Sequence, residues 1–167
     1  MFLKGVYIGL DFDGTVVTHD YPNMGKEVPY CIETLKQITY EGGKLILITM
    51  RSGKSLAEAV AFLADHDIPL YGINHNPQQH LYSKSPKIYA NIYIDDAALG
   101  CPLMYSEFSS NAHVNWLEVQ KYLFPKKGEN QIQSVLMDAP VYDEGPDDQP
   151  GKVVNFFTEM FSRLGFG

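Results

Sequence analysis

The feature that most constrains the fold is a short apolar run at residues 6–10, which ends on two acids separated by one residue. The run reads Val-Tyr-Ile-Gly-Leu and is followed by Asp11, Phe12, Asp13 and Gly14. Such a run, ended by a glycine, predicts a buried strand followed by a sharp turn. Both carboxylates then leave the strand at its C-terminal end, where open α/β sheets bind their ligands. Two acids this close repel each other and lose hydration, so the pattern indicates a bound cation or a reaction.

Three more short apolar runs follow and predict further strands. They cover residues 45–48, 70–74 and 92–94. Helical patterns follow the first two strands, and strands that alternate with helices predict a parallel sheet with right-handed crossovers. Segment 75–90 is polar and interrupted by prolines, so we expect a loop with at most a short helix there. The fold class we expect is α/β, a three-layer Rossmann-like parallel sheet with helices on both faces.

The predicted helices have recognisable starts and stops. Pro29 suits the first turn of a helix, and the glycine pair at 42–43 ends that helix. Ser55 and Glu58 form a capping-box pattern for a second helix. Trp116 lies in a third amphipathic pattern, where we expect it to be a core residue.

The C-terminal part of the chain differs in composition from the rest, so we divide the chain into a main domain at 1–127 and an extension at 128–167. Segment 138–151 holds five acids and no basic residue, with three prolines and two glycines, and predicts a solvated linker. Residues 153–164 place apolar side chains on one helical face: Val153, Phe157, Met160, Phe161 and Leu164. We expect this amphipathic helix to pack on the body or on a second subunit.

Composition excludes several other classes of protein. The chain has 167 residues, 45% hydrophobic and 20% charged, which is typical of one ordinary globular domain. Its net charge of -7 argues against binding extended nucleic acid. Two cysteines make no disulfide framework, and no apolar run approaches the ~20 residues of a membrane span. We therefore expect a cytoplasmic protein without a membrane partner.

Chemistry-bearing side chains follow three of the predicted strands. Asp11 and Asp13 follow the first strand, Thr49 follows the second, and Asp95 and Asp96 follow the fourth. Since parallel strands bring their carboxyl ends to one edge, these side chains should share one crevice. Clustered carboxylates bind a hard, oxygen-preferring cation, and Mg²⁺ is suited because it leaves room for phosphate and water.

In these motifs the sequence resembles the haloacid dehalogenase superfamily of phosphohydrolases. Its first motif, DxDx(T/V), matches residues 11–15, and its second, a Ser or Thr that ends a strand, matches Thr49. Its third, a lysine upstream of the final acids, resembles Lys87, and its fourth, an acidic pair after a strand, matches Asp95 and Asp96. All four motifs occur in the expected order after the expected elements.

The resemblance implies distinct roles for the four acids. Asp11 would be the nucleophile, and Asp13 the general acid and base, whose main-chain carbonyl would also bind Mg²⁺. Asp95 would complete the metal shell, and Asp96 would support it or share that role. An acid at the position of Asp13 points to phosphate transfer, since relatives that cleave carbon–halogen bonds lack it.

The resemblance also implies roles for a hydroxyl and a cation at the phosphoryl group. Thr49 would donate a hydrogen bond to that group, and Lys87 would neutralise its charge. Lys84 is the competing lysine; Lys87 is preferred because it precedes Asp95 by eight residues. Arg51 could bind substrate or serve as a helix-cap or surface residue. Four polar loop residues should also face the crevice: His19, Asp20, Asn74 and Asn76.

The spacing of the motifs leaves no room for a large cap domain. The intervals from Asp11 to Thr49 and from Thr49 to Lys87 are each 38 residues, which the predicted elements already fill. The resemblance therefore implies a capless, Mg²⁺-dependent phosphomonoester hydrolase that acts on a phosphorylated small molecule or larger partner. Capless relatives either accept large partners or close their sites by forming homo-oligomers. The alternative is a non-catalytic protein that binds a phospholigand or a partner on the same scaffold.

Overall fold

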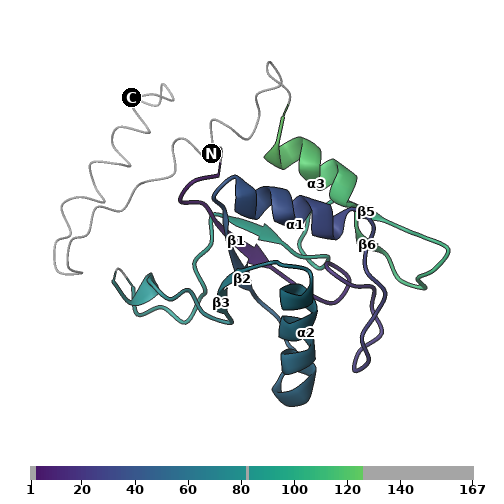
Figure 1. The fold of residues 1–167 in the computed structure, drawn as a ribbon, viewed down its shortest axis with the longest axis horizontal. Helices are drawn as coiled ribbons and strands as arrows, with labels where there is room; N and C mark the ends of the chain where they lie inside the picture. The colour runs from purple at the N-terminus through teal and green to yellow at the C-terminus, as the bar shows by residue number, and fades with distance from the viewer. Residues whose placement is uncertain (1–2, 82, 126–167) are drawn as a thin grey trace.

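The computed structural model describes residues 3–81 and 83–125, and its main element is a four-stranded parallel sheet with helices packed against it (Figure 1). The elements are β1 (Tyr7–Leu10), α1 (Cys31–Tyr40), β2 (Lys44–Leu47), α2 (Gly53–Asp65), β3 (Leu70–Ile73), the 3₁₀ helix η1 (Gln79–Leu81), β4 (Ile92–Ile94), β5 (Leu103–Met104), β6 (His113–Val114) and α3 (Trp116–Leu123). The strand order is β3-β2-β1-β4, and β5 and β6 form a separate antiparallel pair. The predicted α/β class and the four predicted strands are confirmed.

Strand β1 lies at the centre of the sheet, where it pairs with β2 on one side and β4 on the other. Leu10, its last residue, is in register with Leu47 of β2 and Ile94 of β4. The next amide, that of Asp11, donates a hydrogen bond to the Ile94 carbonyl at 3.0 Å. The first acid of the motif therefore leaves the sheet between two neighbouring strand ends.

One face of the sheet is covered by helices. Residues of α1, α2 and α3 share one core with alternate strand residues, namely Ile8, Leu10, Leu45, Leu47 and Ile94. The steps from β1 to β2 and from β2 to β3 run in the same direction across the sheet. Right-handed crossovers therefore put α1 and α2 on the same face.

The other face carries the connection between β3 and β4. The Tyr7 hydroxyl donates to Gln78 Oε1 at 2.6 Å, and the Tyr93 hydroxyl donates to the Ile88 carbonyl. A Cβ on Gly9 would lie 2.9 Å from the Tyr93 ring, so both residues lie on this face. Within the part of the chain that the structure describes, this face has η1 but no α-helix. The expectation of helices on both faces is therefore wrong for these residues, because the connection is aromatic and extended rather than helical.

Two helix starts differ from the sequence prediction. Tyr30, with φ of 64°, precedes α1, so Pro29 lies outside the helix instead of in its first turn. Helix α2 begins at Gly53, and the Ser55 hydroxyl donates to the Ser52 carbonyl at 2.9 Å, so no capping box forms at Ser55. The β5–β6 pair was not expected, since two-residue strands are too short to produce a recognisable pattern.

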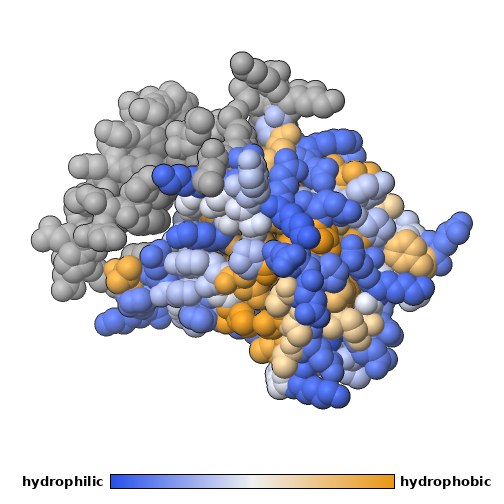
Figure 2. Space-filling model, viewed as in Figure 1, coloured by the Kyte–Doolittle hydropathy of each residue, from blue (hydrophilic) through white to orange (hydrophobic). Residues whose placement is uncertain are grey.

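The remaining sequence expectations concern the surface and the C-terminus. Hydrophobic side chains in the view of Figure 2 form patches among hydrophilic ones. Among the described helices none is long and apolar enough to cross a membrane. The predicted linker, the helix at 153–164 and the boundary at 127 all lie outside the described residues.

Helix α3 fixes the loop that carries the two acids. Trp116 is buried, and its indole Nε1 donates to the main-chain carbonyl of Thr15 at 2.8 Å. The amide of Val114 donates to the carbonyl of Gly14 at 2.9 Å. The core role predicted for Trp116 is confirmed, and the side chain also anchors the loop after β1.

We predict that Trp116→Phe lowers the free energy of unfolding by about 1–3 kcal/mol, because it leaves the Thr15 carbonyl buried without its donor. Urea denaturation followed by circular dichroism measures the loss. The neighbouring Leu117 is 44% exposed, so Leu117→Ala should change stability by no more than about 0.5 kcal/mol. Equal effects of the two substitutions would mean that the indole contact does not hold the loop.

Candidate active site

The loop after β1 is a tight turn that requires a glycine. The carbonyl of Phe12 accepts hydrogen bonds from the amides of Val16 and Val17, at 2.8 and 3.1 Å. Gly14 has φ of 87°, a value that side chains disfavour. A Cβ at this position would lie 2.3 Å from Asp96 Oδ2. Gly14 therefore allows both the turn and the close approach of the acid that follows β4.

Three carboxylates meet at the C-terminal ends of β1 and β4. One oxygen from each of Asp11, Asp95 and Asp96 lies within 4.8 Å of the other two. The Thr15 hydroxyl donates to Asp11 Oδ2 at 3.0 Å and accepts from the Asp96 amide at 3.2 Å. The structure thus brings together three of the four acids predicted as metal ligands, and Thr15 connects two of them.

Burial and neighbouring charges raise the pKa of Asp11 from 3.8 to about 6. Loss of hydration is the largest cause, and the negative charges of Asp95 and Asp96 add to it. Hydrogen bonds from the Phe12 amide and the Thr15 hydroxyl act in the opposite direction. The ionised form of Asp11 is therefore destabilised in the folded protein, and a cation beside it would stabilise that form.

The donor set of this cluster fits a hard divalent cation. Asp11, Asp95 and Asp96 offer carboxylate oxygens, which such cations prefer. His19 Nε2 contacts Asp96 Oδ2 at 2.8 Å and would orient this carboxylate toward the others. Hydrogen bonding of a ligating carboxylate by a neighbouring side chain is common at metal sites.

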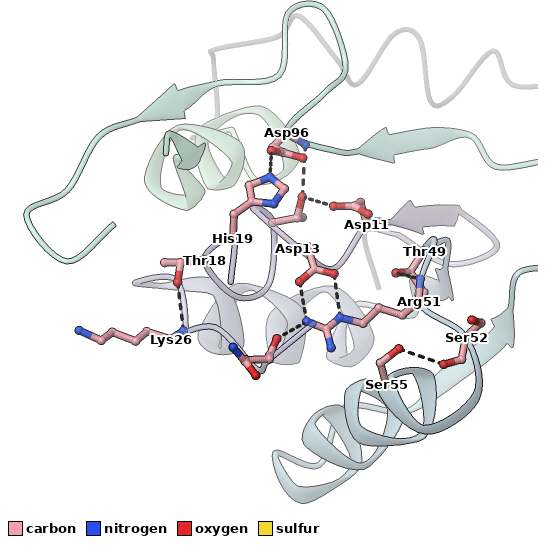
Figure 3. A network of polar contacts seen from close by, with 12 residues as sticks. Asp11, Asp13, Thr18, His19, Lys26, Thr49, Arg51, Ser52, Ser55 and Asp96 are labelled. Atoms are coloured by element: carbon pink, nitrogen blue, oxygen red, sulfur yellow. Dashed lines mark hydrogen bonds and ion pairs between the residues drawn. The ribbon is translucent and has the colours of Figure 1, made fainter. Parts of the chain in front are cut away.

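The side chain of Asp13 points away from this cluster and pairs with Arg51. Its two oxygens accept from Arg51 Nε at 2.7 Å and Nη2 at 2.6 Å (Figure 3). This bidentate contact is the main cause of the raised pKa of Arg51. Arg51 is only 2% exposed, and Nη2 also donates to the Asn23 carbonyl at 2.7 Å. The two acids of the motif thus have different surroundings, although one residue separates them.

Thr49 lies at the end of β2 and is held by an asparagine from the end of β3. The Thr49 amide donates to Asn74 Oδ1, and Asn74 Nδ2 donates back to the Thr49 carbonyl, both at 2.9 Å. The Thr49 hydroxyl accepts from the Arg51 amide at 3.2 Å. Among the polar loop residues expected at the crevice, Asn74 and His19 contact site residues, whereas Asn76 donates to the Tyr89 carbonyl.

The predicted lysine is not joined to the acids by any contact recorded among residues 3–81 and 83–125. Lys87 is exposed; its amide donates to Ser85 Oγ at 3.2 Å, and its carbonyl accepts from Gln79 Nε2 at 2.7 Å. Lys84 lines an open cavity of about 280 Å³ within the connection from 74 to 88. A role for either lysine at the phosphoryl group stays a prediction.

Sequence reasoning missed the partners of the acids. The pairs Asp13–Arg51 and His19–Asp96 join residues 38 and 77 positions apart. No local pattern signals such contacts, because they depend on which strand ends are neighbours. The order of the strands in the sheet, with β1 between β2 and β4, is the information that the sequence pattern lacks.

Comparison with known proteins gives one informative match. No family model matches the sequence, and no curated protein matches it. Among solved structures, that of a conserved protein from Bacteroides thetaiotaomicron is 32% identical, with a TM-score of 0.60. The match covers 73% of this chain and 92% of that one. The chain belongs to the family of this conserved bacterial protein. That relative is described as conserved, without an activity.

The raised pKa of Asp11 predicts how stability depends on pH. In the unfolded chain the carboxyl loses its proton near 3.8, whereas the folded protein holds it up to about 6. The stability contribution of this group is therefore complete below pH 3.8 and is lost as the pH rises through 6. Because Asn stays neutral, Asp11→Asn in a chelator should be more stable than the wild type by about 1–2 kcal/mol at pH 8. This gain should shrink toward pH 4.5.

Urea denaturation from pH 4.5 to 8 measures this difference. Asp67→Asn, at an exposed position outside the cluster, is the control and should show no comparable trend. Adding Mg²⁺ should stabilise the wild type and leave Asp11→Asn unchanged. A gain from Asp11→Asn that is the same at every pH would contradict the assignment.

Proposed function

We propose that this protein is a Mg²⁺-dependent phosphatase of the haloacid dehalogenase type, which hydrolyses phosphomonoesters through an aspartyl-phosphate. The observation that carries the proposal is the separation of the acids into two environments. Asp11 lies with Asp95 and Asp96, whose oxygens are within 4.8 Å of one another, whereas Asp13 is held apart by Arg51. A nucleophile beside a cation site and a separate proton carrier are the two parts that such a reaction needs.

In the first half of the reaction, a carboxylate oxygen of Asp11 attacks the phosphorus. The bond between phosphorus and the ester oxygen breaks, and the leaving oxygen takes a proton from Asp13. Because both Asp13 oxygens accept from Arg51 in the structure, the oxygen that carries this proton must release its contact with Arg51 while the other oxygen keeps its contact. The raised pKa of Asp11, about 6, favours attack, because a carboxylate of higher pKa is the stronger nucleophile and is ionised at neutral pH. The Thr15 hydroxyl holds Asp11 Oδ2 in place.

In the second half, water hydrolyses the acyl phosphate. Asp13, now a carboxylate, takes a proton from the water as the water oxygen attacks phosphorus, and the bond to Asp11 breaks. Inorganic phosphate leaves, and Asp13 keeps the proton for the next cycle. The same side chain thus acts first as an acid and then as a base.

Asp11, Asp95 and Asp96 would hold Mg²⁺, with the main-chain carbonyl of Asp13 as an additional ligand. The cation would supply compensation for the negative charge of the phosphoryl group. The Thr49 hydroxyl would donate to a phosphoryl oxygen. A lysine of the connection between β3 and β4, for which Lys87 is the prediction, would neutralise charge there.

A second candidate is a non-catalytic protein that binds a phospholigand or a partner with the same scaffold. All the acids that turnover requires are present among the described residues, which favours the enzyme. The two functions differ in one measurable respect. The enzyme releases inorganic phosphate, whereas the binding protein does not.

We predict that the full-length protein hydrolyses a generic aryl phosphate in the presence of Mg²⁺ and loses this activity in EDTA. Returning Mg²⁺ in excess over the chelator should restore activity. Release of inorganic phosphate is measured over a panel of sugar phosphates, nucleotides and phosphopeptides, which also identifies the substrate class. Absent or metal-independent turnover over the whole panel would favour the binding protein.

We also predict different defects for the two opening acids. Asp11→Asn removes the attacking oxygen, so turnover should vanish on every substrate. Asp13→Asn keeps the main-chain carbonyl but removes the proton donor, a contribution of typically 10²- to 10⁴-fold. Alkyl phosphates need the proton more than aryl phosphates, so Asp13→Asn should slow them more.

Rapid-quench measurement of the acyl-phosphate burst with both substrates separates these outcomes. It is performed at high Mg²⁺ so that weakened binding does not limit the reaction. A substantial burst from Asp11→Asn, or equal slowing of aryl and alkyl phosphates by Asp13→Asn, would show that the roles are assigned wrongly.

A further inference from the structure

The side chain of Arg51 joins the second acid of the motif to a hairpin that lies beside the site. Three of its donor contacts are made by two nitrogens: Nε and Nη2 bind Asp13, and Nη2 also binds the Asn23 carbonyl. Asn23 belongs to the hairpin over residues 17–27, whose arms are joined by the amide of Thr18 at 2.8 Å from the Lys26 carbonyl. One guanidinium therefore contacts both the acid and the hairpin (Figure 3).

Aromatic rings complete the environment of this guanidinium. Its Cζ lies 5.2 Å from the centroid of the Phe12 ring and 5.5 Å from that of Tyr21. Phe12 is buried next to the motif acids, whereas Tyr21 is a hairpin residue that is 61% exposed. Guanidinium groups are attracted to ring faces at such distances. The hairpin thus contacts Arg51 through a ring as well as through a main-chain carbonyl.

The burial of Arg51 argues against a substrate-binding role, which was one of the alternatives that the sequence left open. Nη1 is buried and has no hydrogen-bond partner in the structure. A buried donor without a partner costs about 1–3 kcal/mol, so the other contacts must outweigh it. The side chain as a whole is 2% exposed. Two nitrogens are engaged by Asp13 and the Asn23 carbonyl and the third is buried, so the guanidinium exposes no donor to a phosphate group in the crevice.

We propose that Arg51 is a positioning residue, which orients the carboxyl group of Asp13 for proton transfer and ties that orientation to the closed hairpin over residues 17–27. The inference rests on the proposed function for the role of Asp13, but the contact with the hairpin does not. Arg51 acts through Asp13 and touches neither the phosphoryl group nor the cation. Its loss should therefore reduce the rate of proton transfer more than the binding of substrate.

The kinetic test compares Arg51→Ala and Arg51→Lys with the wild type on aryl and alkyl phosphates. For Arg51→Ala we expect kcat on the alkyl phosphate to fall on the order of 10²-fold, with less than about a 3-fold change in KM. The loss on the aryl phosphate should be smaller. Arg51→Lys keeps the positive charge but cannot make the bidentate contact, so its loss of kcat on the alkyl phosphate should be intermediate. If Arg51→Ala does not fold, Arg51→Lys is compared with the wild type in its place.

A double mutant tests whether Arg51 acts through Asp13. If it does, Asp13→Asn combined with Arg51→Ala should be no slower on the alkyl phosphate than Asp13→Asn alone. Multiplied defects would mean an independent role. Added guanidinium ions should partly restore Arg51→Ala and should not restore the double mutant.

The hairpin is tested without any substrate. Hydrogen exchange of the Thr18 and Lys26 amides should become at least about 10-fold faster in Arg51→Ala, because the hairpin loses two of its contacts. Lys54→Ala is the control: this residue lies on α2, its side chain is 91% exposed and it pairs with Glu58 at 3.5 Å. Exchange and kinetics of Lys54→Ala should match those of the wild type.

The outcomes separate this inference from the proposed function. If the wild type shows no Mg²⁺-dependent turnover, the proposed function fails, and the exchange of the hairpin amides still decides whether Arg51 holds the hairpin. If turnover is present but Arg51→Ala raises KM and slows aryl and alkyl phosphates equally, Arg51 binds substrate and the inference is wrong. Unchanged exchange of the Thr18 and Lys26 amides would equally overturn it.

Discussion

The cost of burying carboxylates that the sheet gathers at one place is the constraint on which the rest of the site depends. One oxygen from each of Asp11, Asp95 and Asp96 lies within 4.8 Å of the other two. Loss of hydration is the largest part of the cost of ionising Asp11, and the charges of Asp95 and Asp96 add to it. The protein offsets part of this cost locally, through hydrogen bonds to Asp11 from the Phe12 amide and the Thr15 hydroxyl. The remaining unfavourable energy is what a divalent cation would relieve. Cation binding at the cluster, as proposed, would therefore stabilise the folded protein.

The fold holds these charges together by placing them at the C-terminal ends of two neighbouring strands. β1 lies between β2 and β4, so the chain segments after β1 and β4 emerge side by side. Trp116 of helix α3 and the amide of Val114 in β6 then fix the loop after β1. Gly14 removes the one side chain that would prevent Asp96 from approaching. A rigid frame of this kind keeps carboxylates close although they repel each other.

The two acids of the opening motif are chemically identical, and their neighbours make them different. Asp11 is surrounded by negative charge, whereas Asp13 is paired with a buried guanidinium. Two carboxyl groups that point in different directions from one turn can have different chemical roles, such as nucleophilic attack and proton transfer. The hairpin over residues 17–27 supplies part of both environments, through His19 on one side and Asn23 on the other.

The sequence by itself determined the strands, the α/β class and the positions of the acids at strand ends. These features are local: an apolar run of four or five residues and the polar residue after it are adjacent in the chain, so the pattern contains them. Asp11, Thr49 and Asp95 could therefore be placed at one edge of the sheet from the sequence alone. The burial of Trp116 could also be predicted locally, because the helical spacing of the apolar residues around it is a pattern within one short segment.

Only the tertiary structure decided the partners of these residues. The sequence left Arg51 open between substrate binding and a helix-cap or surface role. In the structure it pairs with Asp13, which is 38 positions away, and the order of the strands brings the two together. The structure likewise put the described α-helices on one face of the sheet, because the connection from β3 to β4 has only η1. Lys87 lies on that connection. The path of the connection, rather than the spacing of Lys87 from Asp95 in the sequence, decides which atoms this lysine can reach. Contacts between distant residues depend on strand order and loop path, and the hydrophobic pattern of a sequence encodes neither.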